Sequence, residues 1–505
     1  MSRFTLPPDA DETALAAALD DRCELVVGPA RELKLTYLDT FDWRLFNSER
    51  ILIEERSDEL RLVLHEPGAE PYAVPVDATP RLADDLPAGH LTDRIASRLG
   101  LRALIEVGAA DVVRREGRIQ DRCGDLVSRV RIETVAPIDD EGRRLDSTTT
   151  LRIDDGPILD ALAETLRLEP APDTDLAAVA SRRGRRPGAY SSKLDIPLAP
   201  DQRSDSAVVT ILLDLLDTLE ANVDGIIADL DPEFLHDLRV AGRRTRSALT
   251  QLKGVLPKPT VAPFNPEFKW LGGVTGPLRD LDVFLLEMPS YRSMLPDHAA
   301  ADLEPLASLI MTMRRRAHRT VARALRSGRF RELVTDWRRT LESFRPADRP
   351  DAARSVSSLA AERIGTAHRR IVKKGRTLGE DPPAAALHRL RIDAKKLRYL
   401  LEFFKNLYPP AVIGGRIEEL KRLQDILGGC NDMEVQRRRL ETLAGELHRD
   451  PTVDAATIMA LGRLTGVLEE RQESYRRSFH DAFRDFTSGT VLDAYAEISD
   501  HVEVP

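Results

Sequence analysis

Two short segments of the sequence carry basic side chains at a spacing that would place them on one face of a helix. The basic residues of the first segment are His236, Arg239, Arg243, Arg244 and Arg246. Those of the second segment are His388, Arg391, Lys395, Lys396 and Arg398. At about 100° per residue, four basic side chains in each segment fall within one sector of roughly 80°, with apolar side chains opposite. Each segment therefore predicts a helix with an apolar back and a cationic front.

Few acidic residues accompany these two cationic faces. Residues 236–253 hold five Lys or Arg and one acid, and residues 388–405 hold six Lys or Arg and two acids. Like charges three or four residues apart on a helix repel each other, so the face is destabilising unless something offsets it. One hypothesis is a bound anion. The alternatives are a solvated surface or ion pairs with acids from other helices, such as Asp280 and Asp432.

The two basic segments belong to an internal repeat. His236 and His388, which begin them, are 152 residues apart, and the basic and apolar residues that follow match in order. A second pair of similar segments, 276–283 and 428–435, has the same offset of 152 residues. Because two separate motifs share one offset, we expect two related helical bundles in tandem.

The chemistry of the side chains indicates the type of anion. Arginine donates paired hydrogen bonds to phosphate oxygens, lysine adds a compact charge, and histidine donates most strongly when protonated. A linear chain of phosphates needs cations repeated along a line, which two like helices facing each other would supply. The further candidate ligands for phosphate are Lys269, Arg314, Arg315, Lys421 and Arg422. We identify no catalytic residue, no metal ligand and no cofactor in the sequence.

Composition limits the class of protein. The chain has 505 residues and a net charge of −9, so anion binding has to come from local clusters of Lys and Arg. Aromatic residues make up only 5%, which argues against base stacking and disfavours a nucleic-acid partner. The sequence lacks an apolar run of about 18 residues and a basic-then-apolar start, so we expect neither a membrane span nor a secretory signal. Three distant cysteines fit a reducing cytoplasm, where we expect the protein.

The chain divides into three regions by residue pattern. Residues 1–168 alternate short β-rich runs with two helical stretches, which predicts an α+β domain with mostly antiparallel strands. Residues 169–204 are rich in Pro, Gly and basic residues and predict a linker with a basic patch. Residues 205–500 have helical patterns separated by prolines, with repeat halves at about 205–345 and 350–500.

The repeated motif resembles the CHAD domain family. The resemblance rests on H-x-L-R-[VI]-x-x-[KR]-[KR]-x-R at His236 and His388, and on G-x-x-[RN]-D-x-[DE] at Gly276 and Gly428. It covers about residues 205–490 and implies an all-α fold of two four-helix bundles around a basic channel. It also implies binding of inorganic polyphosphate without catalysis. A location at polyphosphate granules, beside granule-associated proteins, is a further hypothesis.

The N-terminal region is similar to the CYTH family of triphosphate tunnel enzymes. Tyr37, Asp39 and Thr40, with the strand that ends at residues 54–56, resemble the family's Y-x-D-T and L-R-x-R elements. The family cleaves triphosphates in a β-tunnel with an E-x-E-x-K strand and carboxylate-bound metal, whereas the first strand here, residues 2–6, reads SRFTL. We therefore predict a degenerate, tunnel-like domain that is catalytically dead or strongly altered. The alternative is a metal-dependent triphosphate or polyphosphate hydrolase to which the CHAD domain delivers substrate.

Overall fold

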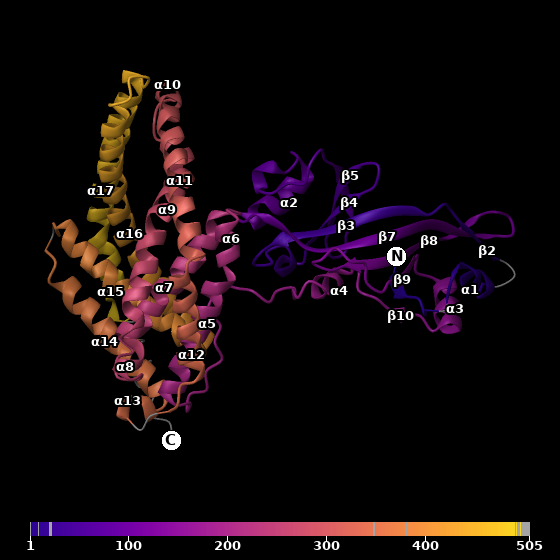
Figure 1. Cartoon of the computed structure of the whole chain (residues 1–505), viewed down its shortest axis with the longest axis horizontal. Coiled ribbons are helices and arrows are strands. Elements are labelled where there is room, and N and C mark those ends of the chain that lie inside the picture. The colour runs from indigo at the N-terminus through magenta and orange to yellow at the C-terminus, as the bar shows by residue number, and fades with distance from the viewer. Residues whose placement is uncertain are drawn as a thin grey trace. The chain divides into compact units, whose positions relative to one another are not determined.

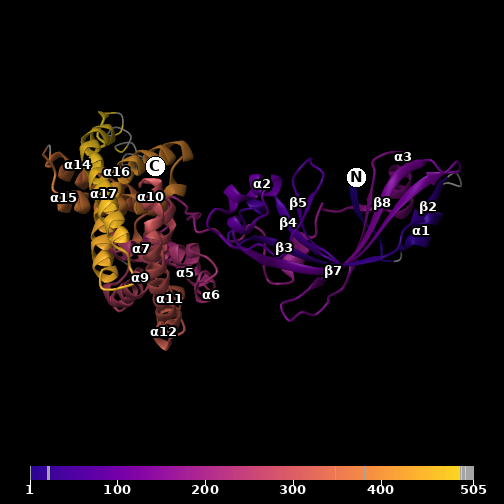
Figure 2. The same ribbon diagram turned by 90° about the horizontal axis from the view of Figure 1, so that it is seen from above.

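The computed structural model describes residues 2–8, 10–19, 23–346, 349–379, 381–489, 491 and 495. The chain forms two compact units, Met1–Ser191 and Ser192–Pro505. Figures 1 and 2 show that the first unit is built on strands and the second on helices. We call them the sheet unit and the helical unit and describe each by itself. The predicted order, an antiparallel α+β domain followed by an all-α duplicated domain, is confirmed.

The strands of the described part of the sheet unit form one ten-stranded antiparallel sheet. Its order is β10-β1-β9-β8-β7-β3-β4-β5-β6, and β2 pairs with β7 outside this path. The strands are β1 Ser2–Thr5, β2 Cys23–Val27, β3 Arg31–Thr40, β4 Ile51–Arg56, β5 Leu60–His65, β6 Tyr72–Pro75, β7 Leu104–Asp121, β8 Leu126–Ile138, β9 Thr148–Ile153 and β10 Glu169–Pro170. Long β7 and β8 pair along most of their lengths and form the centre of the sheet.

Short helices cover the apolar parts of this sheet. They are α1 Glu12–Ala17, α2 His90–Leu99, α3 Pro157–Leu166 and α4 Leu176–Ser181, with 3-10 turns η1 Phe46–Ser48 and η2 Ala83–Asp85. Helix α4 packs Leu176 and Val179 into a core with Tyr37. Gly108 permits this approach, because a Cβ there would lie 2.8 Å from Val179 Cγ1. Part of the segment predicted to be a linker, residues 169–204, thus forms β10 and α4 of the sheet unit.

The helical unit runs through long helices joined by short ones. The helices are α5 Ser204–Ala221, α6 Val223–Ile227, α7 Pro232–Gln251, α8 Lys258–Val261, α9 Phe264–Ser293, α10 Asp297–Ala300, α11 Glu304–Leu325, α12 Gly328–Glu342, α13 Pro350–Ala353, α14 Val356–Arg376, α15 Ala384–Phe403, α16 Pro410–Leu447 and α17 Ala455–Phe486, with 3-10 turns η3 Ala301–Leu303 and η4 Lys405–Leu407. The start of α7 is fixed by Pro232 in its first turn and by the Asp231 carboxylate, which accepts from two backbone amides.

The internal repeat is visible in the helix boundaries. Helix α7 spans 232–251 and α15 spans 384–403, so both of their ends differ by the offset of 152 residues. Helices α5, α9 and α11 correspond in the same way to α14, α16 and α17, with ends that depart from this offset by up to nine residues. Each repeat therefore contributes four matching helices. An apolar cluster that includes Leu281, Ile310, Leu440 and Leu464 joins α9 and α11 to α16 and α17.

Candidate anion-binding site

Helices α7 and α15, which carry the two basic motifs, pack against each other, and one carboxylate joins them. Glu402 on α15 accepts from Arg244 Nη2 on α7 at 2.7 Å and from Arg398 Nε at 2.7 Å. Gln251 Nε2 on α7 also donates to the backbone oxygen of Lys396 at 3.0 Å. Arg244 thus helps to hold the two repeats together, while Arg398 pairs with the same carboxylate from within α15.

A hollow of about 160 Å³ lies between α7 and α9 in the first repeat. Four of the predicted site residues line it, namely Arg239, Arg243, Arg246 and Lys269. Small residues on α9, including Gly272 and Gly273, leave the space open. In the part of the chain that the structure describes, no carboxylate forms an ion pair with any of these four cations.

Arg239 is the most constrained of these cations. Its Nη1 donates to the backbone oxygen of Gly272 at 2.9 Å and to Thr275 Oγ1 at 2.9 Å, while its buried Nε has no hydrogen-bond partner. Gly276 makes room for the guanidinium, since a Cβ there would lie 3.6 Å from Nη1. Burial and the nearby charge of Arg243 lower the pKa of Arg239. The charge of Asp280 acts in the opposite direction, but no carboxylate of the described chain forms an ion pair with this arginine, which is held at the wall of the hollow.

The second repeat contributes Lys395, which lies on α15, the helix that contacts α7. Burial, followed by the charges of Arg391 and Arg243, lowers the pKa of Lys395 to about 8. Arg243 belongs to α7, and its contribution agrees with the Arg244–Glu402 and Gln251–Lys396 contacts between the two helices, while the charge of Asp432 acts in the opposite direction. No ion pair to Lys395 is found among the described residues. We call Arg243, Arg246, Lys269 and Lys395 the cationic seam.

Other predicted residues of the second repeat have partners within the chain. Arg391 forms an ion pair with Asp432 at 3.0 Å, and His388 Nδ1 lies 2.5 Å from Asn431 Oδ1. Lys396 lies 3.8 Å from the carboxylate of Asp393, which also pairs with two cations of α14. The second basic face is therefore more fully neutralised than the first.

The remaining predicted residues lie apart from the hollow or are already paired. Arg314 bonds to Asp229 at 2.6 Å and to Asp282 at 2.7 Å, and these carboxylates raise its pKa. Arg315, Lys421 and Arg422 are exposed, and His236 is half-buried on α7. The alternative hypothesis of ion pairs with acids from other helices holds for Arg391, whose partner is Asp432, and for Arg244, whose partner is Glu402. Arg314 also pairs with an acid of another helix, which is Asp282 and not Asp280.

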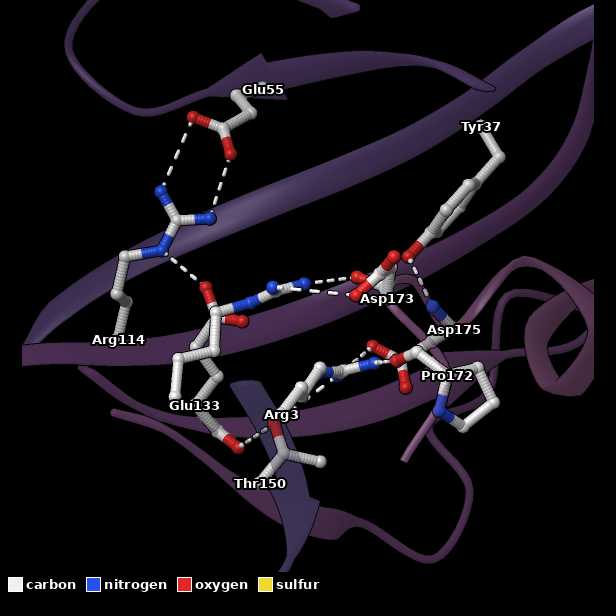
Figure 3. Close-up of polar contacts among 10 residues, drawn as sticks. Arg3, Tyr37, Glu55, Arg114, Glu133, Thr150, Pro172, Asp173 and Asp175 are labelled. Carbon is white, nitrogen blue, oxygen red and sulfur yellow. Dashed lines mark hydrogen bonds and ion pairs between the residues drawn. The ribbon is translucent and has the colours of Figure 1, made fainter. Parts of the chain in front are cut away.

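The sheet unit also carries arginines, but its own carboxylates pair with them. Arg114 bonds to Glu55 at 2.7 Å and to Glu133 at 2.6 Å, as the β7–β8 register places Arg114 opposite Glu133. Figure 3 shows these side chains pointing toward one another. Burial alone would raise the pKa of Glu133, but the hydrogen bond and charge of Arg114, together with the charges of Arg131 and Arg3, hold the pKa below its usual value. We call Arg3, Glu55, Arg114 and Glu133 the charged sheet face.

The segment that follows β10 supplies further carboxylates and carbonyls to this face. Arg3 donates to Asp175 at 2.5 Å and to the backbone oxygen of Pro172 at 2.7 Å (Figure 3). Arg152 donates to the backbone oxygen of Asp173. The amide of Asp175 donates to the Tyr37 hydroxyl at 3.3 Å. The arginines of this face thus already have oxygen partners from the chain itself.

Within the described ranges there is no group of three or more His, Cys, Asp or Glu residues arranged to hold a metal ion. Asp39 of the Y-x-D-T element accepts from the backbone amides of Leu45 and Phe46, both at 2.9 Å, and so shapes a turn. Burial raises the pKa of Asp39 to about 6.

Comparisons with known proteins identify the helical unit by class. Residues 210–441 match the model of the CHAD domain family, so this segment of the chain is a CHAD domain. The match is shorter than the predicted range of 205–500 and ends within α16. The antiparallel sheet of the N-terminal unit is consistent with a tunnel fold, and the resemblance of this unit to the CYTH family stays a prediction.

Two solved structures are similar to the chain. One is the CHAD domain from the plant Ricinus communis, with 27% identity, a TM-score of 0.48, and coverage of 58% of this chain and 97% of that chain. The other is PptA from Streptomyces chartreusis, with 19% identity, a TM-score of 0.45, and coverage of 56% and 100%. No curated protein matches the chain. Among the described helices, none is long and apolar enough to cross a membrane.

The residues that the sequence interpretation missed are those that shape the site without carrying positive charge. Glu402 joins the two motif helices, and Gly272 and Gly273 open the hollow. The offset of 152 residues could have drawn attention to Gly272, because Gln424 occupies the equivalent position in the second repeat.

Proposed function

We propose that the helical unit binds inorganic polyphosphate, or a similar linear phosphate polyanion, along the cationic seam without transforming it. The observation that carries this proposal is the contact between the two motif helices through Arg244–Glu402 and Gln251–Lys396. These helices carry Arg243 and Lys395, and no carboxylate forms an ion pair with either in the described chain. A CHAD domain at residues 210–441 agrees with this function.

The electrostatics of the seam favour a polyanion over a single small anion. Like charges held near one another in a partly buried site raise the free energy of the unbound protein. A chain of phosphates places one negative charge after another along the seam, and offsets several of these repulsions in one binding event. Neutralising several phosphates also releases counterions, so affinity should fall steeply with salt.

The direct test is a titration of long-chain polyphosphate into the whole protein at fixed salt. We expect the double variant Arg243→Ala, Lys395→Ala to bind at least about tenfold more weakly, because a hydrogen bond to a charged group contributes about 1.5–3 kcal/mol. The matched control is Arg438→Ala, Arg484→Ala, which also removes two positive charges. Both control arginines are exposed on the surface and paired with a neighbour on their own helix.

Three outcomes would contradict the assigned site, the preference for polyphosphate or the absence of catalysis. Unchanged affinity in a folded seam variant would overturn the site assignment. DNA and RNA competing as well as polyphosphate at equal salt would replace polyphosphate selectivity with general polyanion binding. Release of orthophosphate from tripolyphosphate in the presence of magnesium or manganese would replace the non-catalytic proposal with the hydrolase alternative.

We further propose that polyphosphate binding places the protein at polyphosphate granules in the cytoplasm. The proposal follows from the proposed ligand alone. Fluorescence imaging of the tagged protein should show granule localisation that the seam double variant loses. Equal localisation of both proteins would instead point to recruitment by a granule-associated protein.

A further inference from the structure

The two repeats differ at the position that opens the α7–α9 hollow. Gly272 on α9 and Gln424 on α16 are 152 residues apart, the same offset as Lys269 and Lys421. In the first repeat, the space beside Gly272 is part of the hollow of about 160 Å³. This volume is well above the roughly 10–15 Å³ that admits one water molecule, so the space can hold a group with several oxygens.

In the second repeat, the side chain of Gln424 fills the equivalent space. Its Nε2 donates to the backbone oxygen of Ala394 at 2.7 Å, and its Oε1 lies 3.5 Å from Arg398 Nη1. Ala394 and Arg398 are the equivalents of Gly242 and Arg246, which line the hollow in the first repeat. Gln424 thus bonds to the counterparts of two residues that form the walls of the hollow.

The charges around Gly272 and Gln424 also favour an anion in the first repeat over the second. Asp432 neutralises Arg391 at 3.0 Å, whereas the equivalent Arg239 contacts only neutral oxygens of Gly272 and Thr275 in the described chain. In the second repeat, a glutamine side chain therefore stands where the first repeat has a glycine, and Arg391 has a carboxylate partner.

We propose that the α7–α9 hollow is a phosphoryl pocket present in the first repeat alone, and that it anchors one phosphoryl group of the bound chain. Arg239, Arg246 and Lys269 supply the positive charge, and Gly272 supplies the room. The second repeat guides the rest of the polyanion from the surface. This inference rests on the proposed function, because it specifies how the same ligand is held.

Exchanging the residues of the two repeats tests the pocket. Gly272→Gln copies the second repeat into the first, and a Cβ at Gly272 meets only Arg246 Nη1, at 3.8 Å. Glutamine is also a better helix former than glycine, so the fold should not suffer. The reciprocal variant is Gln424→Gly. The matched control is Gly462→Gln on α17, where an added Cβ has no neighbour within 4 Å.

We expect Gly272→Gln to weaken the binding of both tripolyphosphate and long-chain polyphosphate at least about tenfold. The loss of affinity should be larger for tripolyphosphate, because it makes fewer contacts elsewhere on the protein. Gln424→Gly and Gly462→Gln should stay within about threefold of the wild type. Inorganic phosphate is the third ligand, and its competition with tripolyphosphate should also be lost in Gly272→Gln. Thermal unfolding monitors the fold of each variant.

The possible outcomes distinguish failure of the pocket proposal from failure of the proposed polyphosphate-binding function. If Gly272→Gln binds normally while the seam double variant does not, the pocket is overturned and the function stands. Equal losses in Gly272→Gln and Gln424→Gly would overturn the asymmetry. A wild-type protein that binds none of the three ligands would overturn the proposed function itself.

Discussion

The charged sheet face and the cationic seam both contain arginines, yet they differ in whether these cations are available to bind an anion. On the sheet, Arg114 already bonds to two glutamates, and Arg3 bonds to Asp175 (Figure 3). In the seam, Arg243 and Lys395 lie on two helices that contact each other, and neither forms an ion pair with a carboxylate in the described chain. The number of cations therefore does not define an anion site. What matters is whether the chain itself supplies the oxygens.

The difference has a geometric origin. Neighbouring strands place side chains directly opposite each other, so the β7–β8 register can give Arg114 the partner Glu133. A helix face offers only neighbours three or four residues away and whatever another helix presents. In the seam both helices present positive charge. Four predictions, ordered from the largest expected effect to the smallest, test this contrast.

The largest effect is expected for Arg114→Ala on the sheet. It leaves Glu55 and Glu133 with little compensation in a mostly buried position, which should lower the stability of the sheet unit by about 3 kcal/mol. Hydrogen exchange of the β7 and β8 amides should report on the order of 100-fold faster opening. Polyphosphate affinity should change less than twofold. A large loss of binding would show that the sheet face contributes to the site.

Next in size is a pH dependence that originates in Lys395. With its pKa lowered to about 8, this lysine loses its charge as the pH rises through 8, so affinity for long-chain polyphosphate should fall by up to about tenfold per pH unit above that value. Lys395→Arg should remove the dependence because arginine stays charged. Titrations between pH 6.5 and about 9.5 decide the matter, and the same slope in both proteins would assign the titration elsewhere.

The third prediction compares an unpaired with a paired cation inside the helical unit. Lys269→Ala should reduce the slope of log affinity against log salt by about 0.7, because one phosphate contact is lost. Arg314→Ala should leave the slope unchanged while lowering stability, since Asp282 is left buried without its partner. Binding isotherms at several salt concentrations measure both slopes. Equal slope changes would mean that existing pairing does not exclude Arg314 from the site.

The smallest effect is expected where a sheet arginine loses its carboxylate. Asp175→Asn keeps the shape of the side chain but removes the charge that faces Arg3, which is almost fully buried. Added inorganic phosphate should then slow hydrogen exchange at β1 by about twofold, an effect that the wild type should not show. Asp173→Asn is the control, because Asp173 faces Arg152 and is largely exposed. Equal protection in wild type and variant would remove the role assigned to Asp175.

Sequence patterns predicted the parts of the fold that depend on local order. The repeat offset of 152 residues reappears in the boundaries of α7 and α15, and the helical periodicity gave their apolar and basic faces. The partners of individual cations depend on tertiary packing and could not be predicted. Arg314 meets Asp229, which lies 85 residues away along the chain. Likewise, α4 forms in a segment predicted to be a linker. The surface beside Gly108 against which this helix packs exists only in the folded sheet, so local sequence could not predict it.

The carboxylate of Glu402 has a consequence for how the two repeats recognise each other. Its equivalent in the first repeat is Thr250, so only one half of the duplicated unit supplies the acid that accepts from both Arg244 and Arg398. Two copies of the first half would bring these basic helices together with no acid between them. A chain cut between α12 and α14 should therefore reassemble as a pair of unlike fragments and not as two homodimers. The two repeats are therefore expected to be no longer interchangeable.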